Sequence, residues 1–280
     1  ARLSSTIREP LAAVGQATGT SVEIRAIPGN HDVGYRLPKE SAAVEAERRW
    51  AATWGDPQWF TTWSHWPVVG INALRLLRGD GPSTTVDATQ AWLRAEPWAS
   101  GDAAAPRRRT IVASHVPWHR QPTASCGTAR PDDAPALRPG SGYSYTNVLG
   151  ARETATLAAS LQPVLVLSGD DHHWCVVDHA ATDNHPAFVE VTVGTVSWLQ
   201  GSTTPSGALI RLRPDGLTVA RVALPWPLYG YRLYVMGAAV LWLAMLWWRL
   251  QAPLGPLHVG TIDVEGGGAL LGRHGPTAPA

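Results

Sequence analysis

The sequence predicts an α/β (α+β) fold, a mixed-sheet sandwich flanked by helices, followed by a C-terminal transmembrane helix. Apolar runs with strand character alternate with helical segments along the first 225 residues, and a long uncharged run follows near the C-terminus. A chain of 280 residues is long enough for one sizeable α/β domain plus a membrane element. We expect a domain over residues 1–225, a transmembrane helix over residues 229–250 and a flexible tail over residues 251–280.

The first half of the chain alternates strand and helix signals. Residues 22–27 alternate apolar and polar side chains and end at Pro28-Gly29, which predicts a strand that runs into a loop. Residues 42–54 are rich in Ala, Glu and Arg and stop at Gly55, as a helix does. The other elements expected here are a strand, a helix with Asp87 as its candidate cap and a short buried strand, at residues 68–77, 87–98 and 110–113.

The second half begins with a long irregular segment. Residues 120–142 have no periodicity and many Pro and Gly, and their place directly after a motif favours a functional loop. Residues 152–161 predict a helix, and the apolar run at residues 164–167 predicts a buried strand. Three more strands are expected at residues 188–193, 208–212 and 217–223, the last two joined by a hairpin turn at Pro214-Asp215-Gly216.

Charge bears on the possible partners of the chain, and its cysteine content bears on its covalent structure. The chain has 23 Lys and Arg against 22 Asp and Glu, a net charge of +1, so no global field attracts nucleic acid and we expect no nucleic-acid partner. The two cysteines, Cys126 and Cys175, either form one disulfide in an oxidising compartment or stay as two free thiols. The sequence leaves these two states open.

The uncharged run near the C-terminus predicts the membrane helix. Residues 233–248 carry no charge and lie between Arg232 and Arg249. Extended to residues 229–250, the segment reaches spanning length, and its terminal Tyr and Trp side chains suit the two membrane interfaces. A buried or interfacial helix is the alternative, and the apolar character all round the helix disfavours an amphipathic surface element. Arginines lie on both sides, so charge does not settle the orientation.

Three short motifs place metal-binding side chains directly after predicted strands. They are Gly29-Asn30-His31-Asp32, Ser114-His115-Val116-Pro117 and Ser168-Gly169-Asp170-Asp171-His172-His173. In open α/β folds the loops at the carboxyl ends of strands meet in one crevice, and amide, imidazole and carboxylate groups together suit a divalent ion.

Taken singly, the three motifs differ in specificity. Asn30-His31 alone also fits a turn, and His115 alone fits a structural histidine. The third motif is stronger, because two adjacent carboxylates at the end of a buried strand repel each other unless a cation is near.

At these residues the chain resembles the calcineurin-like metallophosphoesterases, which carry Gly-Asn-His-Asp/Glu, a lone His and a Gly-His-x-His motif in this order. The closer resemblance is to the membrane-anchored branch that removes ethanolamine phosphate from mannoses of the GPI-anchor glycan. Pieces similar to its fungal members include residues 28–35, Cys126-Gly127, residues 140–149 and the Gly-Asp-Asp-His variant in residues 167–175. The resemblance extends over about residues 24–212.

The resemblance implies roles for individual side chains. It assigns Asn30, His115 and Asp170 to one metal and His172 to the other, with Asp170 where the wider family has His. His31 would donate a proton to the leaving oxygen, oriented by Asp32. Two divalent ions are implied, Mn first, with Fe or Zn as alternatives. Two aromatic residues could line a glycan-binding cleft, but their alternate spacing also fits one face of a strand; they are Tyr143 and Tyr145.

The resemblance also implies partners and a location. The partners would be a GPI-anchor glycolipid or a GPI-anchored protein, together with membrane lipid. The protein would lie in the endoplasmic reticulum or Golgi membrane with its catalytic domain in the lumen.

The family's first two motifs, Asp-x-His and Gly-Asp-x-x-Asp, do not occur upstream of Gly29. We therefore expect this chain alone to bind two metals poorly and to turn over little, as an incomplete piece of a longer active enzyme. A noncatalytic, membrane-tethered pseudoenzyme that binds a glycolipid or protein partner is the alternative. A cytosolic protein phosphatase is a third reading, which the apolar C-terminal helix disfavours.

Overall fold

A computed structural model describes most of the chain. The described residues are 9, 13, 16–17, 19, 22–34, 40–77, 84–96, 98, 109–121, 123–128, 130, 134, 140–142, 145–197, 200, 202, 204–225 and 227–251. The chain divides into two compact units, Ala1–Tyr229 and Gly230–Ala280, which are described separately.

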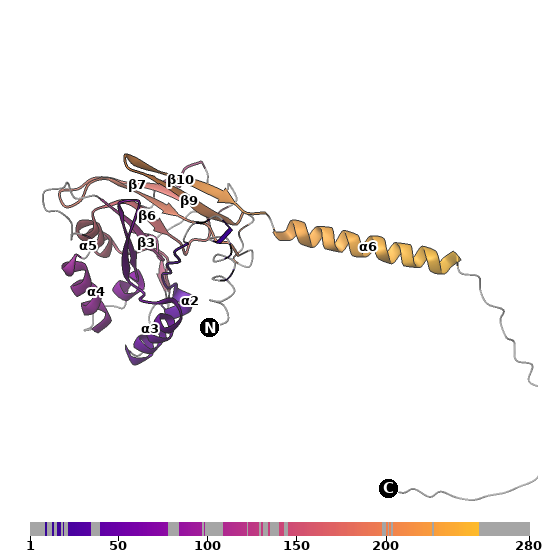
Figure 1. Ribbon diagram of the computed structural model, residues 1–280, viewed down its shortest axis with the longest axis horizontal. Coiled ribbons are helices and arrows are strands. Elements are labelled where there is room, and N and C mark those ends of the chain that lie inside the picture. Colours follow the sequence, from indigo (N-terminus) through magenta and orange to yellow (C-terminus); the bar gives the residue numbers. More distant parts are fainter. Residues whose placement is uncertain are drawn as a thin grey trace, which may run out of the picture. The chain divides into compact units, whose positions relative to one another are not determined.

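The first unit is built on a six-stranded mixed sheet with strand order β1-β2-β3-β6-β8-β7. Figure 1 labels three of these strands, β3, β6 and β7. Its strands are β1 (Trp59–Trp63), β2 (Trp66–Ile71), β3 (Thr110–Ser114), β6 (Pro163–Ser168), β7 (Cys175–His179) and β8 (Phe188–Thr192). The four central strands β2, β3, β6 and β8 are parallel, and β1 and β7 pair antiparallel at the two edges. Since β3 and β6 are parallel neighbours, their carboxyl ends lie at the same edge of the sheet.

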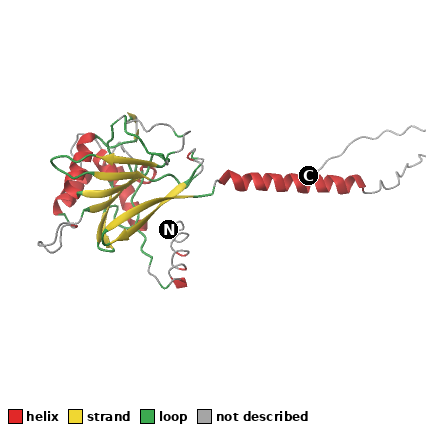
Figure 2. Cartoon of the chain, turned by 90° about the horizontal axis from the view of Figure 1, so that it is seen from above, coloured by secondary structure: helices red, strands yellow, loops and turns green. Residues whose placement is uncertain are grey.

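Helices cover one face of this sheet, and Figure 2 shows them grouped beside the strands. They are α3 (Glu40–Trp54), the 3₁₀ helix η1 (Ala73–Leu77), α4 (Thr84–Ala95) and α5 (Ala151–Leu161). The core on this side joins Val112 and Val166 of the sheet to Leu157 and Leu161 of α5, all with no exposed surface or almost none. The prediction of a mixed sheet flanked by helices is confirmed.

A hairpin of β9 (Ser206–Arg213) and β10 (Gly216–Ala223) packs on a second apolar cluster. Its inward side chains, such as Ile210 and Val219, pack in the same cluster as Ile111 and Leu165 of the sheet. The register pairs Arg213 with Gly216, so the turn predicted around Pro214-Asp215-Gly216 is confirmed. Two short strands, β4 (Ser141–Gly142) and β5 (Tyr145–Thr146), pair separately.

Two predicted strands need correction. Residues 22–27 form no strand, and they contact β1 through its tryptophans: Trp59 Nε1 donates to the Ala26 carbonyl at 2.8 Å. Alternation predicts an extended backbone, but it cannot show that a neighbouring backbone comes within pairing distance. The strand expected at residues 68–77 ends at Ile71, where buried Asn72 begins the turn into η1 by accepting a hydrogen bond from Arg75 N at 3.2 Å.

Other differences are smaller. Helix α4 begins at Thr84, so Asp87 lies inside its first turn and is not its cap. Strands β1 and β7 were not predicted, because Trp-rich and His-flanked runs show little alternation.

The second unit contains a single long helix in its described part, α6 (Pro227–Gln251). From Tyr229 to Gln251 this helix is long and apolar enough to cross a membrane, and every side chain along it is exposed. These bounds agree with the helix expected at residues 229–250. Of the tail expected at residues 251–280, Gln251 is the last residue of α6, and residues 252–280 lie outside the described residues.

Candidate metal centre

Three of the four predicted metal ligands lie together. The Oδ1 atom of Asn30 is 2.9 Å from Nε2 of His115, and the same Nε2 atom is 3.3 Å from Oδ1 of Asp170. The His115 and Asp170 side chains are 24% and 12% exposed, so the group lies near the surface with limited access to water. Two oxygens and one nitrogen therefore converge from three segments that are far apart in the sequence.

The parallel strands of the sheet and the glycine at position 29 explain this convergence. His115 follows β3 and Asp170 follows β6, and the Gly169 N–H donates to the His115 carbonyl at 2.8 Å across the two strand ends. Asn30 begins the short helix α2 (Asn30–Val33). A Cβ on Gly29 would lie only 3.1 Å from Cε1 of His115, so glycine lets this third segment approach the imidazole.

The loop after β6 has an unusual backbone. Asp170 and His172 both have positive φ, +63° and +66°, a conformation that costs free energy for residues other than glycine and is concentrated at functional sites. Neighbouring backbone holds the loop in place, because Val193 N donates to the Ser168 carbonyl at 2.7 Å and Thr195 N donates to the His172 carbonyl at 2.9 Å.

His172, the ligand predicted for a second metal, is half-buried in the same loop. Within the described part of the chain its side chain forms no hydrogen bond or ion pair with the other three. Nor do the described residues contain a group of three or more His, Cys, Asp or Glu placed to hold an ion. The described residues thus bring together the ligands predicted for one metal, with His172 close by in sequence.

The predicted acid pair, His31 and Asp32, is exposed on α2. The Asp32 carboxylate accepts a hydrogen bond from the Gly29 N–H at 2.8 Å, which closes the first turn of this helix. No hydrogen bond joins Asp32 to His31 among the described residues. The orientation of His31 by Asp32 stays a prediction, and the contact that the structure shows for Asp32 is a helix cap.

The predicted substrate tyrosines are not tested. Tyr143 lies outside the described residues, and Tyr145 begins β5 but its side chain lies outside the described part.

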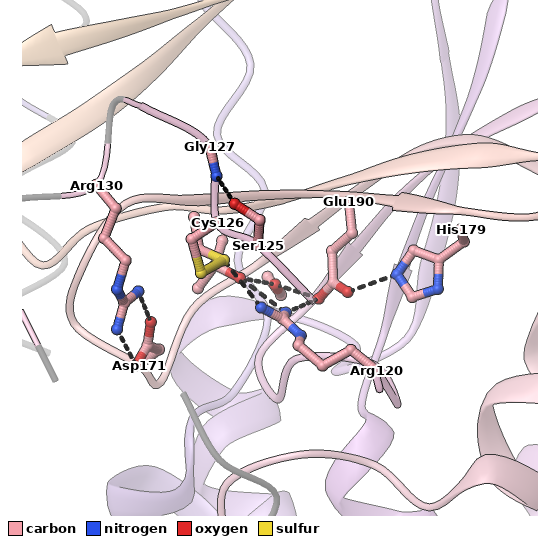
Figure 3. Close-up of a disulfide and its surroundings, with 11 residues drawn as sticks. Arg120, Ser125, Cys126, Gly127, Arg130, Asp171, His179 and Glu190 are labelled. Carbon is pink, nitrogen blue, oxygen red and sulfur yellow. Dashed lines mark hydrogen bonds and ion pairs between the residues drawn. A yellow bond between two sulfur atoms is a disulfide. The ribbon is translucent and has the colours of Figure 1, made fainter. Parts of the chain in front are cut away.

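The second carboxylate of the third motif has a cation of its own. Asp171 is paired with Arg130, with Nη1 of the arginine 2.5 Å from Oδ2 of the aspartate, and both side chains are nearly buried (Figure 3). The repulsion expected between the adjacent carboxylates of Asp170 and Asp171 is therefore relieved at Asp171 by an arginine. Asp170 is left to face His115.

The sequence reasoning missed a buried charged residue in the sheet, Glu190 of β8. It has no exposed surface and lies within ion-pair or hydrogen-bond distance of Arg120 and His179, as Figure 3 shows. Burial opposes ionisation, but the hydrogen bond from His179, the charge of Arg120 and a hydrogen bond from Ser168 together hold the pKa of Glu190 below its ordinary value. The sequence did offer one indication of this residue, since Glu190 is a carboxylate at the centre of the largely apolar run of β8.

Cys126 and Cys175 form a disulfide, with Cα atoms 4.4 Å apart (Figure 3). The structure thus decides between the two states that the sequence left open. The bond joins the loop after β3 to the first residue of β7, and Val176 N reinforces it by donating to the Cys126 carbonyl at 3.1 Å.

The donor chemistry fits a divalent metal. Amide oxygen, imidazole nitrogen and carboxylate oxygen form a mixed set that suits Mn, Fe or Zn better than Ca. Asn30, His115 and Asp170 fit one ion, and His172 is the candidate contributor to another.

Comparison with known proteins agrees with this geometry. A family model described as calcineurin-like phosphoesterase matches residues 2–174. Cell division control protein 1 of Saccharomyces cerevisiae is 23% identical over 235 residues, 76% of this chain and 45% of that protein. Metallophosphoesterase 1 of Cricetulus griseus is 26% identical over 243 residues, 81% of this chain and 58% of that protein. A Metallophosphoesterase 1 homolog of Caenorhabditis elegans is 26% identical over 132 residues, 47% of this chain and 36% of that protein.

The mixed sheet, the candidate ligands at its strand ends and the family match define a domain of the calcineurin-like phosphoesterase class. The chain belongs to the calcineurin-like phosphoesterase family, whose members typically bind two divalent metals. It spans about half the length of the curated relatives it matches, 45%, 36% and 58% of the three named above.

Proposed function

We propose that this protein is a metal-dependent phosphodiesterase that removes ethanolamine phosphate from a mannose of the GPI-anchor glycan. The observation that carries the proposal is the convergence of Asn30, His115 and Asp170 at the strand ends of a calcineurin-like domain. This donor set would hold a divalent ion, with Mn as the first choice. When bound, the metals of such a site neutralise charge that develops on the phosphoryl group.

The chain's own residues would act around the phosphorus atom. Water adds to phosphorus, the bond from phosphorus to the mannose oxygen breaks, and that oxygen needs a proton as it leaves. His31, exposed beside Asn30, is the side chain that we assign to this proton. Its neighbour Asp32 fixes the first turn of α2 and so restricts where His31 can lie.

Three features support the choice of a membrane glycolipid. Helix α6 is long and apolar enough to span a bilayer, which would keep the domain near a lipid-linked substrate. The Cys126–Cys175 disulfide suits an oxidising compartment. The segments at residues 140–149 and 167–175 are similar to the GPI-processing branch. We therefore propose a GPI-anchor glycolipid or GPI-anchored protein as substrate, and the lumenal side of the endoplasmic reticulum or Golgi membrane as the location.

Hydrolysis by the protein expressed from its full transcript and extracted in detergent tests this proposal. The substrate would be a mannoside carrying ethanolamine phosphate, assayed with and without Mn²⁺. We expect Mn²⁺-dependent release of ethanolamine phosphate, and a fall in kcat of about 10²–10⁴-fold on His31→Ala. His65→Asn is the control, because His65 is an exposed turn residue with positive φ that Asn tolerates. Release that needs no metal, or an equal loss in both variants, would contradict the assignment.

One observation favours the noncatalytic alternative, a membrane-tethered protein that binds a glycolipid or protein partner. The described residues gather the ligand set of a single metal. A titration with Mn²⁺ separates the two functions: two bound ions per protein favour hydrolysis, and one ion without release of ethanolamine phosphate favours binding alone.

A further inference from the structure

Glu190 is the most completely buried charged group in the described part of the first unit, with no exposed surface in either the whole residue or its side chain. An unpaired buried carboxylate is costly, so its partners must hold it in one position. Each of its two oxygens has them. Oε1 accepts hydrogen bonds from Trp118 N at 2.9 Å and Ser168 Oγ at 2.6 Å, and Oε2 lies 2.9 Å from His179 Nε2.

Two of these partners belong to the segments that carry metal ligands. Trp118 lies three residues after His115, and Ser168 lies two residues before Asp170. One carboxylate oxygen of Glu190 therefore joins the loop after β3 to the end of β6. Glu190 itself contacts none of the predicted ligands in the hydrogen bonds and ion pairs described for it.

Arg120 extends this connection toward the disulfide, as Figure 3 shows. Its Nη2 atom is 3.1 Å from Glu190 Oε1 and donates to Thr192 Oγ1 at 3.1 Å, while Nη1 donates to Cys175 Sγ at 3.1 Å. The Arg120 side chain is only 2% exposed. Loss of the carboxylate would leave this guanidinium buried without its counter-charge, and the loop after β3 would have to move to hydrate it.

We propose that Glu190 is a positioning residue for the metal centre: it fixes His115 relative to Asp170 by binding the backbone of one segment and the strand-end hydroxyl of the other. The inference rests on the proposed function, because it assumes that these residues hold a metal. Groups that orient metal ligands without touching the ion commonly change metal affinity 10–100-fold when removed, which is about the effect expected here.

A purely structural role is the competing explanation, and the chain offers a matched control for it. Glu47 of α3 forms another buried ion pair, with Arg75 of η1, and their side chains are 7% and 15% exposed. These two residues lie on segments that carry none of the predicted ligands. Glu190→Gln and Glu47→Gln each neutralise one partner of a buried ion pair, so both should destabilise the fold, but only Glu190→Gln should weaken metal binding.

The experiment is a titration with Mn²⁺ of the detergent-solubilised protein expressed from its full transcript, in which the electron paramagnetic resonance signal reports free Mn²⁺. Thermal unfolding without metal would be measured in parallel for each variant. We expect Glu190→Gln to raise the Kd for Mn²⁺ by about 10–100-fold and Glu47→Gln to change it less than about twofold. Equal Kd values for wild type and Glu190→Gln, or equal weakening in both variants, would overturn the inference.

The outcomes also separate this inference from the proposed function. If the wild-type protein binds no Mn²⁺, both the proposed metal site and this inference are refuted. If the wild type binds Mn²⁺ and Glu190→Gln binds it equally well, only this inference is refuted. If Glu190→Gln does not fold, Ser168→Ala replaces it, since this change deletes only the hydroxyl that donates to Glu190 Oε1 at 2.6 Å. A Kd raised about threefold or more by Ser168→Ala supports positioning, and an unchanged Kd refutes it.

Discussion

Loss of the Cys126–Cys175 disulfide should lower the free energy of unfolding more than loss of any single hydrogen bond at the site would. The bond closes a loop with a sequence separation of 49 residues, and the chain-entropy treatment gives about 4 kcal/mol for a loop of this length. For a domain of this size each kcal/mol moves the melting temperature by about 2–4 °C, so the expected loss is roughly 8–16 °C. The double replacement Cys126→Ala with Cys175→Ala avoids placing new polar atoms at Cys175, which is fully buried.

Thermal unfolding followed by tryptophan fluorescence measures this effect in the detergent-solubilised chain, with and without a thiol reductant. Reductant should lower the melting temperature of the wild type toward that of the double variant and should leave the double variant unchanged. A double variant that melts within about 2 °C of the oxidised wild type would refute the entropic reasoning, because the loop length alone sets its magnitude.

Three further predictions concern pH, packing and the membrane helix. The folded state holds the pKa of Glu190 below its ordinary value of 4.5. The ionised carboxylate therefore stabilises the fold fully above about pH 4.5, and this stabilisation is lost as the pH falls further. Glu190→Gln should flatten the decline in melting temperature between roughly pH 5 and pH 3. Gly70→Ala should cost about 1–3 kcal/mol in urea unfolding, because its Cβ would lie 2.2 Å from the Trp59 ring, whereas Gly207→Ala meets nothing within 4 Å and serves as the control. Leu241→Arg should release the chain from membranes during an alkaline carbonate wash, since a central arginine costs about 2.5–3.5 kcal/mol on insertion; retention equal to wild type would argue against a spanning α6.

The sequence was informative where a pattern and a motif coincided. The apolar runs before His115 and Asp170 are the parallel neighbours β3 and β6, so their strand-end positions explain why two residues far apart in the chain meet. The uncharged run near the C-terminus likewise forms the helix α6. Its composition and length were enough to predict this helix without any tertiary contact.

Contacts that depend on tertiary structure could not be read in this way. Glu190 lies in a strand whose apolar neighbours predict burial. No local sequence pattern predicts that Trp118 N and Ser168 Oγ will both donate hydrogen bonds to its carboxylate. The helix-capping contact of Asp32 was also missed, because Gly29 supplies only a backbone donor and leaves no side-chain signature.

The pairing of β8 with β6 also determines when the site can form during biosynthesis. Asn30, His115 and Asp170 all leave the ribosome before Glu190, whose carboxylate joins two of their segments. If Glu190 positions these segments as proposed, the ligand loops reach their final relative positions only after β8 has been made and has paired with β6, a contact between residues distant in sequence.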